Sequence, residues 1–298
     1  MPSPLPSPVP KPPPSTEIRR ARPLLGTLVE IRAAAAQPPA RLHAAIDAAF
    51  AAVQRVHGLM SFHDAASEVS ALNREAQYRP LRVDAQTWSV LAAAQRLSRL
   101  SEGAFDIAVG ARLQHWGYLP TVSTSAAFEG NWADIELLED CRVRFHRPLL
   151  IDLGGIAKGY AVDCAIEILR QAGVESALVN AGGDLRALGV QPQLVQLRHP
   201  QNPAASMHAL SLCDEALATS ANYFSRRVCA AAEVSPLLDP RNQLPWLGAA
   251  SVSVRAADCI SADALTKLVL FATPDLAERV LAAYGAQAYV QQPAAAAA

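Results

Sequence analysis

The chain has 298 residues, of which 51% are hydrophobic and 18% charged, so it has enough apolar material for a sizeable core. A formal net charge of -1 gives no support for a nucleic-acid partner, which would favour a basic patch or stripe. The five cysteines are odd in number and show no CxxC spacing, which argues against a disulfide framework or a zinc site.

The two ends of the sequence differ from the rest of the chain. Residues 1–17 are rich in proline and lack the apolar segment of a secretory signal or a membrane-spanning helix, so we expect a disordered tail there. The alanine-rich residues 293–298 are expected to fray. One domain over residues 18–292 is therefore predicted, without stable membrane insertion. We expect it in the cytoplasm, or in the periplasm if the native N-terminus differs. The sequence defines no oligomeric state.

The first part of the domain shows a strand and two helices. Residues 26–32 alternate apolar and polar side chains, which predicts a strand. A helix is predicted after Pro38 and Pro39, and Asp84 is expected to cap a second one. Apolar residues three or four positions apart mark the buried face of each helix. These residues are Leu42, Ile46, Phe50, Val53 and Val56 in the first helix, and Trp88, Leu91 and Leu97 in the second.

The middle of the chain reads as a strand, a glycine loop, a helix and a second strand. Residues 149–153 form a short apolar run and residues 176–181 another, and the helix between them ends at Gly173. Further helices are predicted at residues 261–271 and 274–284, and a last strand at 286–291. Because strands and helices alternate, we predict an α/β or α+β fold.

Two glycine turns could bind phosphate. In residues 152–159, glycines allow close backbone approach, a helix N-terminus offers N–H groups, and Lys158 adds a positive charge. The spacing is neither GxGxxG nor that of a Walker loop, so a plain strand-to-helix turn explains it about equally well. Residues 180–184 form the second turn at a strand end, where a tight connection with positive φ is as good an explanation.

Several single residues have simple structural explanations. Asp106 follows a helix C-terminus and reads as a turn or cap residue, and Asp263 near a helix start reads as a capping residue. Asp163 lies on a helix face and is expected to be solvated. His63 stands alone in an irregular segment and Ser220 lacks a GxSxG context, so a serine hydrolase is not indicated.

Taken in order, these segments resemble the FAD:protein FMN transferase (ApbE) family from about Leu25 to Val290. The two glycine segments are the most specific parts of the resemblance. The matching pieces are residues 25–27, 60–63, 67–73, 103–106, 109–110, 116–117, 151–161, 178–186, 218–220, 238–241 and 262–265.

The resemblance implies a T-fold-like flavin transferase fold of two interleaved subdomains, with FAD in the cleft. It also implies an Mg²⁺-dependent transfer of FMN from FAD to a Thr or Ser hydroxyl of a target flavoprotein, with AMP leaving. FAD as substrate and an acceptor flavoprotein are the partners it implies. Two alternatives use the same fold: an FAD-binding protein without transferase activity, and an FAD pyrophosphatase that passes FMN to water.

The resemblance also assigns residues. It implies a metal site formed by the Gly155 carbonyl and the Asp263 carboxylate, with Thr266 as the hydroxyl nearest to the family's third position. The residues implied to bind FAD are Leu25, His63, Ala104, Phe105, Asp106, Asp152, Lys158, Gly182, Gly183 and Asp184.

The sequence departs from the family pattern on the reacting side. Pro236 stands where the family has a histidine, so the catalytic residue is unassigned. Lys267 stands where the family has a metal-binding threonine; its ammonium would either repel the metal or replace part of its charge. A shift of one residue turns a helical side chain by about 100°, so Thr266 substitutes poorly unless the helix starts differently.

Overall fold

The computed structural model describes residues 16–122, 129–198, 206–222 and 225–292. Residues 1–15 and 293–298 lie outside the described residues, so the disorder expected there stays a prediction. Strand β1 (Thr16–Leu24) begins two residues before the expected start of the domain, because Thr16 and Glu17 already pair with Ala35 and Ala34. Among the described residues, no helix combines the length and apolar character needed to cross a bilayer. All five cysteines are free, and only Cys259 is buried.

A seven-stranded sheet forms the centre of the fold, in the order β1-β2-β6-β7-β10-β15-β16. Neighbouring strands are antiparallel throughout, which confirms the mixed α/β class and makes it the α+β variant. The sheet unites strands from the two ends of the chain. The strands after β1 are β2 (Thr27–Ala35), β6 (Ser176–Ala181), β7 (Asp184–Leu188), β10 (Ala216–Ser220), β15 (Ser251–Ala256) and β16 (Gln287–Gln291).

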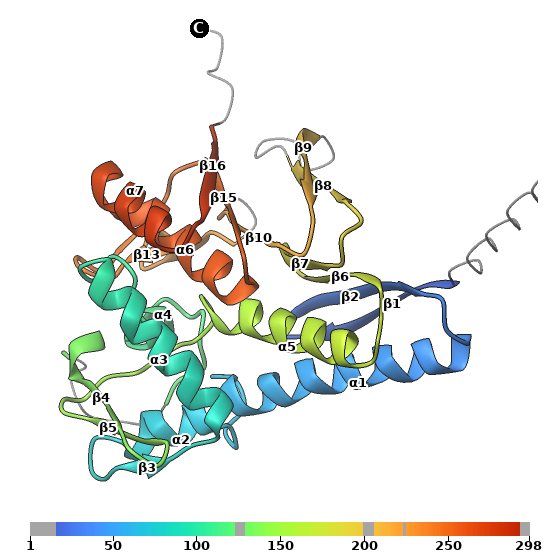
Figure 1. Cartoon of the computed structure of the whole chain (residues 1–298). Helices are drawn as coiled ribbons and strands as arrows, with labels where there is room; N and C mark the ends of the chain where they lie inside the picture. The colour runs from blue at the N-terminus through green and yellow to red at the C-terminus, as the bar shows by residue number, and fades with distance from the viewer. Residues whose placement is uncertain (1–15, 123–128, 199–205, 223–224, 293–298) are drawn as a thin grey trace, which may run out of the picture.

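Three helices pack side by side against this sheet: α1 (Pro39–Met60), α5 (Ala157–Gln171) and α6 (Cys259–Phe271) (Figure 1). The apolar face predicted for α1 is buried, and Pro39 stands at the start of the helix, where a missing N–H costs nothing. Helix α6 begins two residues earlier than expected, because the Asp258 side chain caps it by accepting from the Ser261 N–H. Asp263 is therefore an interior helix residue and not a cap.

A second lobe lies beside the helices (Figure 1, cyan and green). It contains α2 (Glu68–Glu75), α3 (Ala85–Leu100), α4 (Gly110–His115) and the small sheet of β3 (Leu81–Arg82), β5 (Arg142–Phe145) and β4 (Ile135–Leu138). Asp84 caps α3 as predicted, by accepting from the Gln86 N–H. Leu91 and Leu97 are buried, whereas Trp88 is only partly buried.

The remaining elements are short. They are the 3-10 helix η1 (Trp132–Asp134), the strand pairs β8 (Gln193–Arg198) with β9 (Ser206–Leu212), β11 (Arg227–Cys229) with β12 (Ala232–Val234) and β13 (Leu238–Asp239) with β14 (Leu244–Pro245), and helix α7 (Pro274–Ala283) before β16.

The strand predicted at residues 149–153 is wrong. The segment is buried almost throughout, but its backbone groups bond to partners in separate parts of the chain and form no ladder. The Ile151 N–H donates to the Asn73 side chain at 2.8 Å, and the Asp152 N–H donates to the Ile107 carbonyl at 2.8 Å. A run of buried apolar residues does not distinguish such a segment from a strand. These bonds hold Asp152 beside the second lobe.

Candidate functional site

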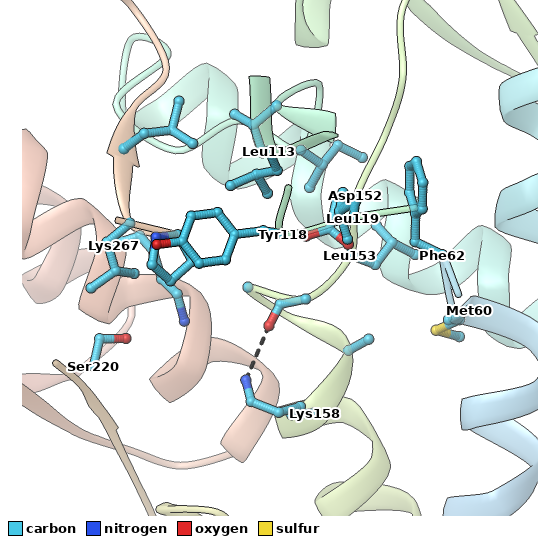
Figure 2. Close-up of a pocket in the computed structure, with 18 of the residues that line it drawn as sticks. Met60, Phe62, Leu113, Tyr118, Leu119, Asp152, Leu153, Lys158, Ser220 and Lys267 are labelled. Atoms are coloured by element: carbon cyan, nitrogen blue, oxygen red, sulfur yellow. Dashed lines mark hydrogen bonds between the residues drawn. The ribbon is translucent and has the colours of Figure 1, made fainter. Parts of the chain in front are cut away.

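A cavity of about 760 Å³ lies where the sheet helices meet the second lobe (Figure 2). Its size falls within the range of about 300–1,000 Å³ that is usual for small-molecule sites. Several of the residues expected to bind FAD or metal line it. They are Leu25, His63, Ala104, Phe105, Asp106, Asp152, Gly155 and Lys158.

Much of the cavity wall is apolar. Leu113, Tyr118 and Leu119 contribute side chains from the second lobe, and Met60 and Phe62 from the end of α1 and the segment after it (Figure 2). The Tyr118 hydroxyl donates to the Ser225 carbonyl at 2.7 Å, which leaves the ring to face the cavity. A planar aromatic ligand would find apolar surface here. Met60 and Phe62 belong to the sequence motif at residues 60–63, whereas no motif included Leu113, Tyr118 or Leu119, although Tyr118 directly follows the motif at residues 116–117.

Leu25 reaches the cavity from the tight turn between β1 and β2. Its φ is +56° and that of Gly26 is +70°. A leucine in the left-handed region costs backbone energy, and such strain is more common at ligand-binding positions. The turn thus holds an apolar side chain at the cavity edge, where the sequence resemblance expects contact with the flavin.

The N-terminus of α5 forms the polar end of the cavity. Gly154, Gly155 and Lys158 line it, and the N-cap residue is Ile156, whose apolar side chain cannot cap the helix. The Ala157 N–H donates to the Leu153 carbonyl at 2.8 Å and the Gly159 N–H to Asp263 at 3.2 Å, so it is the positive end of the helix dipole that would attract an anion here. The Lys158 ammonium donates to the Gly154 carbonyl at 3.0 Å and so lies over the same loop (Figure 2). The first glycine segment therefore has the geometry of an anion site.

Lys158 joins two buried carboxylates. Its Nζ lies 2.8 Å from Oδ2 of Asp184 and 3.3 Å from Oδ2 of Asp263. Burial and the charge of Asp263 raise the pKa of Asp184. Burial alone would raise the pKa of Asp263 as well, but Lys158 and Lys267 bring it below its ordinary value. The pKa of Lys158 is raised, because the two carboxylates outweigh its burial.

The second glycine turn lies behind the cavity wall. Gly182 and Gly183 have φ of +68° and +108°, and a Cβ atom at Gly182 would lie 2.6 Å from Oγ1 of Thr27. These two glycines make a tight hairpin turn and do not line the cavity. Asp184, the first residue of β7, connects the turn to the cavity through its ion pair with Lys158.

Two further aspartates hold local structure. Asp106 accepts from the Ala108 N–H at 2.8 Å and the Trp132 N–H at 3.0 Å, and its burial raises its pKa to about 6. Burial also raises the pKa of Asp152, which lines the cavity. Both are therefore partly desolvated carboxyl groups at the cavity.

The prediction that Asp163 is solvated is wrong. Its side chain is only 14% exposed and accepts from the Cys259 and Ile260 N–H groups at 2.9 and 2.8 Å. Arg186 completes the cluster at 2.6 Å. Asp163 thus ties α5 to the N-terminus of α6, the helix that carries Asp263.

The residues expected to hold a metal do not fit a divalent cation in this arrangement. Lys267 forms an ion pair with Oδ1 of Asp263, and a Cβ atom at Gly155 would lie 3.4 Å from Cε of Lys267. The lysine therefore lies between the two expected ligands. The Thr266 hydroxyl bonds to the Asp263 carbonyl and the Ser220 hydroxyl, both at 2.7 Å. No group of three or more His, Cys, Asp or Glu side chains within the described ranges could hold a metal ion.

Pro236 lines the cavity at the position where the resemblance expected a histidine, so it brings no acid or base there. Imidazole groups do line the cavity, from His57 on α1 and His63 in the following segment. His57 was not singled out in the sequence, although it lies close to the motif that begins at Met60. Asp239 and Arg241 pair with each other at 2.8 Å and lie near this wall.

Comparison with known proteins agrees with this geometry. The ApbE family model matches residues 25–290. The chain is 29% identical to the FAD:protein FMN transferase of Vibrio cholerae over 72% of this chain and 69% of that protein. It is 29% identical to the FAD:protein FMN transferase of Rhodobacter capsulatus over 93% of this chain, which spans 56% of that protein.

Solved structures show the same architecture. The ApbE protein of Thermotoga maritima superposes with a TM-score of 0.81 at 26% identity, covering 94% of this chain and 97% of that one. The flavin transferase ApbE of Vibrio cholerae superposes with a TM-score of 0.75 at 25% identity, covering 93% and 94%. The family model spans most of the sequence and includes every segment that builds the cavity. The chain belongs to the ApbE family.

Proposed function

We propose that this chain transfers FMN from FAD to a Ser or Thr hydroxyl of an acceptor flavoprotein, with AMP as the leaving group. The observation that carries the proposal is the joining, in one cavity, of an apolar compartment to the N-terminus of α5, where Lys158 lies. The apolar compartment suits the flavin ring, and the helix N-terminus with Lys158 suits the pyrophosphate. Relatives named FAD:protein FMN transferase support this assignment.

The reaction makes one bond and breaks one. The acceptor oxygen attacks the phosphorus of the FMN half, and the bond from that phosphorus to the bridging oxygen breaks. AMP leaves with the bridging oxygen, and the hydroxyl proton is released. Negative charge grows on the bridging oxygen, where the positive end of the α5 dipole and the Lys158 ammonium would stabilise it.

The rest of the chemistry is positioning. Attack in line with the leaving oxygen requires the flavin half to be held firmly, which the apolar wall around Tyr118 and Leu25 would do. We assign no general base, because Pro236 has no ionisable group. We also leave a divalent ion out of the step, because Lys267 lies beside Asp263 where the ion was expected.

The test is a mass measurement on the acceptor. The purified chain is mixed with FAD and a flavoprotein domain that offers a Ser or Thr acceptor, once with Mg²⁺ and once with a chelator. A gain of one FMN moiety on the acceptor, with AMP in equal amount, is expected in at least one condition. Free FMN and AMP without a labelled acceptor would identify a pyrophosphatase instead. Bound FAD without any product, with two different acceptors, would identify a binding protein.

A further inference from the structure

Lys267 and Asp263 form a buried pair on one face of α6. They are four residues apart in the helix, the spacing at which side chains meet. The Asp263 side chain is fully buried and that of Lys267 is 14% exposed, so solvent screens their attraction weakly. The Lys267 ammonium also contacts the Asp263 carbonyl at 2.9 Å. This cation is therefore fixed against one residue by two contacts.

The ammonium still has donor capacity toward the cavity. A lysine has three N–H donors, and the acceptors that Lys267 meets among the described residues are both on Asp263. Lys267 lines the cavity, and its Cε atom lies against Gly155 at the start of α5. A third donor can thus reach an anion held at the N-terminus of α5.

The use of lysine at position 267 supports a specific role for its ammonium group. The sequence has 26 basic residues, of which only Lys11, Lys158 and Lys267 are lysines. Both Lys158 and Lys267 pair with Asp263, and Lys158 also pairs with Asp184, whereas the remaining ion pairs among the described residues use arginine or histidine. An ammonium is a compact point charge, closer to a metal ion in size and shape than a planar guanidinium.

We propose that the Lys267 ammonium takes the place of a divalent cation between Asp263 and the pyrophosphate, so that FAD binding and FMN transfer by this chain need no divalent metal ion. The inference rests on the proposed function for its transfer step, but its binding step stands on the cavity alone. Lys267 would donate to a pyrophosphate oxygen, while Asp263 holds its position through the carboxylate and the backbone carbonyl. Mg²⁺ would need several oxygen ligands here, and Lys267 already uses those of Asp263.

The experiment compares the chain with its Lys267→Thr and Lys267→Met variants, each in a chelator and in Mg²⁺. FAD affinity is measured by flavin fluorescence and FMN transfer by acceptor mass. For the unchanged chain, we expect both quantities to differ by less than about twofold between the two conditions. Lys267→Thr restores a metal-type hydroxyl, so we expect its FAD affinity to fall at least about tenfold in chelator and to recover in Mg²⁺. Lys267→Met offers neither charge nor ligand and should stay weak in both.

The control is Arg255→Met, which removes a cation from the partly exposed pair with Glu215, outside the residues that line the cavity. It should bind FAD like the unchanged chain in both conditions. Thermal unfolding of each variant shows whether it folds, and if Lys267→Met does not, Lys267→Thr decides the question. Loss of FAD affinity by the unchanged chain in chelator would overturn the role of Lys267. Absence of transfer in every condition would instead defeat the proposed function, and the FAD affinities would still decide between lysine and metal.

Discussion

The Lys158 ammonium lies 2.8 Å from the buried carboxylate of Asp184, and this ion pair connects the two glycine turns of the chain. Lys158 stands in the first turn of α5, and Asp184 opens β7 directly after the second turn. The Asp184 side chain is only 5% exposed, and among the described residues Lys158 is the cation that forms an ion pair with it.

Replacing Lys158 with methionine should therefore affect stability and binding together. We expect a loss of about 3 kcal/mol in the free energy of unfolding, because Asp184 and Asp263 would both lose a partner in a buried place. FAD affinity should fall at least about tenfold, since a cation is lost at the anion site. Urea unfolding and flavin fluorescence measure the two effects.

The double variant Lys158→Met with Asp184→Asn separates the effect on stability from the effect on FAD binding. Neutralising Asp184 removes one unpaired charge, so part of the stability should return, while FAD affinity should stay low. If the double variant recovered FAD affinity along with stability, Lys158 would act only as a structural partner of Asp184.

Asp106 should make stability depend on pH in the opposite direction to an ordinary ion-paired carboxylate. Its burial raises its pKa from 3.8 to about 6, so the folded protein binds this proton more tightly than the unfolded chain. Its contribution to stability is therefore gained as pH falls through 6 and lost as pH rises. Between pH 7 and pH 4.5 we expect the chain to gain about 2 kcal/mol relative to Asp106→Asn, which cannot titrate there.

Urea unfolding of the unchanged chain and of Asp106→Asn, each at pH 7 and at pH 4.5, measures this pH-dependent gain in stability. The comparison with Asp106→Asn cancels the titration of all other groups. Equal changes in the two proteins would show that Asp106 is solvated enough to keep its ordinary pKa.

Asp163 should be a major stabilising residue. Its carboxylate accepts from the Cys259 and Ile260 N–H groups and pairs with Arg186, so Asp163→Ala would leave three donors without a partner. We expect a loss of about 3 kcal/mol in the free energy of unfolding. Asp275→Ala is the matched control, because this exposed aspartate lies in the first turn of α7 and should cost less than about 1 kcal/mol. Comparable losses of unfolding free energy in both variants would show that Asp163 contributes no more to stability than an exposed aspartate does.

Local patterns predicted the parts of the fold that depend on neighbours in sequence. The three-to-four spacing of Leu42, Ile46 and Phe50 gave the buried face of α1, and Asp84 gave the start of α3. The glycine turn at Gly182 was also visible, because a hairpin turn with positive φ needs such residues. These features have a local physical cause that the sequence displays.

Features that depend on distant partners could not be predicted this way. The sequence predicts that Asp163 faces solvent, because its three donors come from residues 23 to 97 positions further along the chain. The sequence predicts a strand at Ile151, because the actual hydrogen-bond partner, the Asn73 side chain, is 78 residues away. The four-residue spacing of Asp263 and Lys267 on a helix is enough to predict their ion pair. The closeness of Lys267 to Gly155 could not be predicted from the sequence, because the two residues lie far apart in it.

Gly159 lies in close contact with α6, and its substitution tests the packing that positions Asp263. A Cβ atom at Gly159 would lie 2.1 Å from the Cys259 carbonyl oxygen and 2.9 Å from Cβ of Asp263. Backbone atoms cannot move aside as a flexible side chain can, so Gly159→Ala must push the helices apart. We expect a loss of at least about 3 kcal/mol in the free energy of unfolding, together with weaker FAD binding, because the Gly159 N–H would lose its 3.2 Å contact with Asp263.

Gly58→Ala is the matched control for this change. Gly58 lies within α1, and a Cβ atom there would meet nothing within 4 Å. Alanine favours a helix over glycine, so this variant should be more stable by about 0.5–1 kcal/mol. If Gly159→Ala lowers the free energy of unfolding and Gly58→Ala raises it, then the contact between α5 and α6, and not the helix propensity of α5, requires glycine at position 159. A neutral Gly159→Ala would mean that the two helices can separate without cost, and the fixed placement of Asp263 between Lys158 and Lys267 would then lose its structural basis.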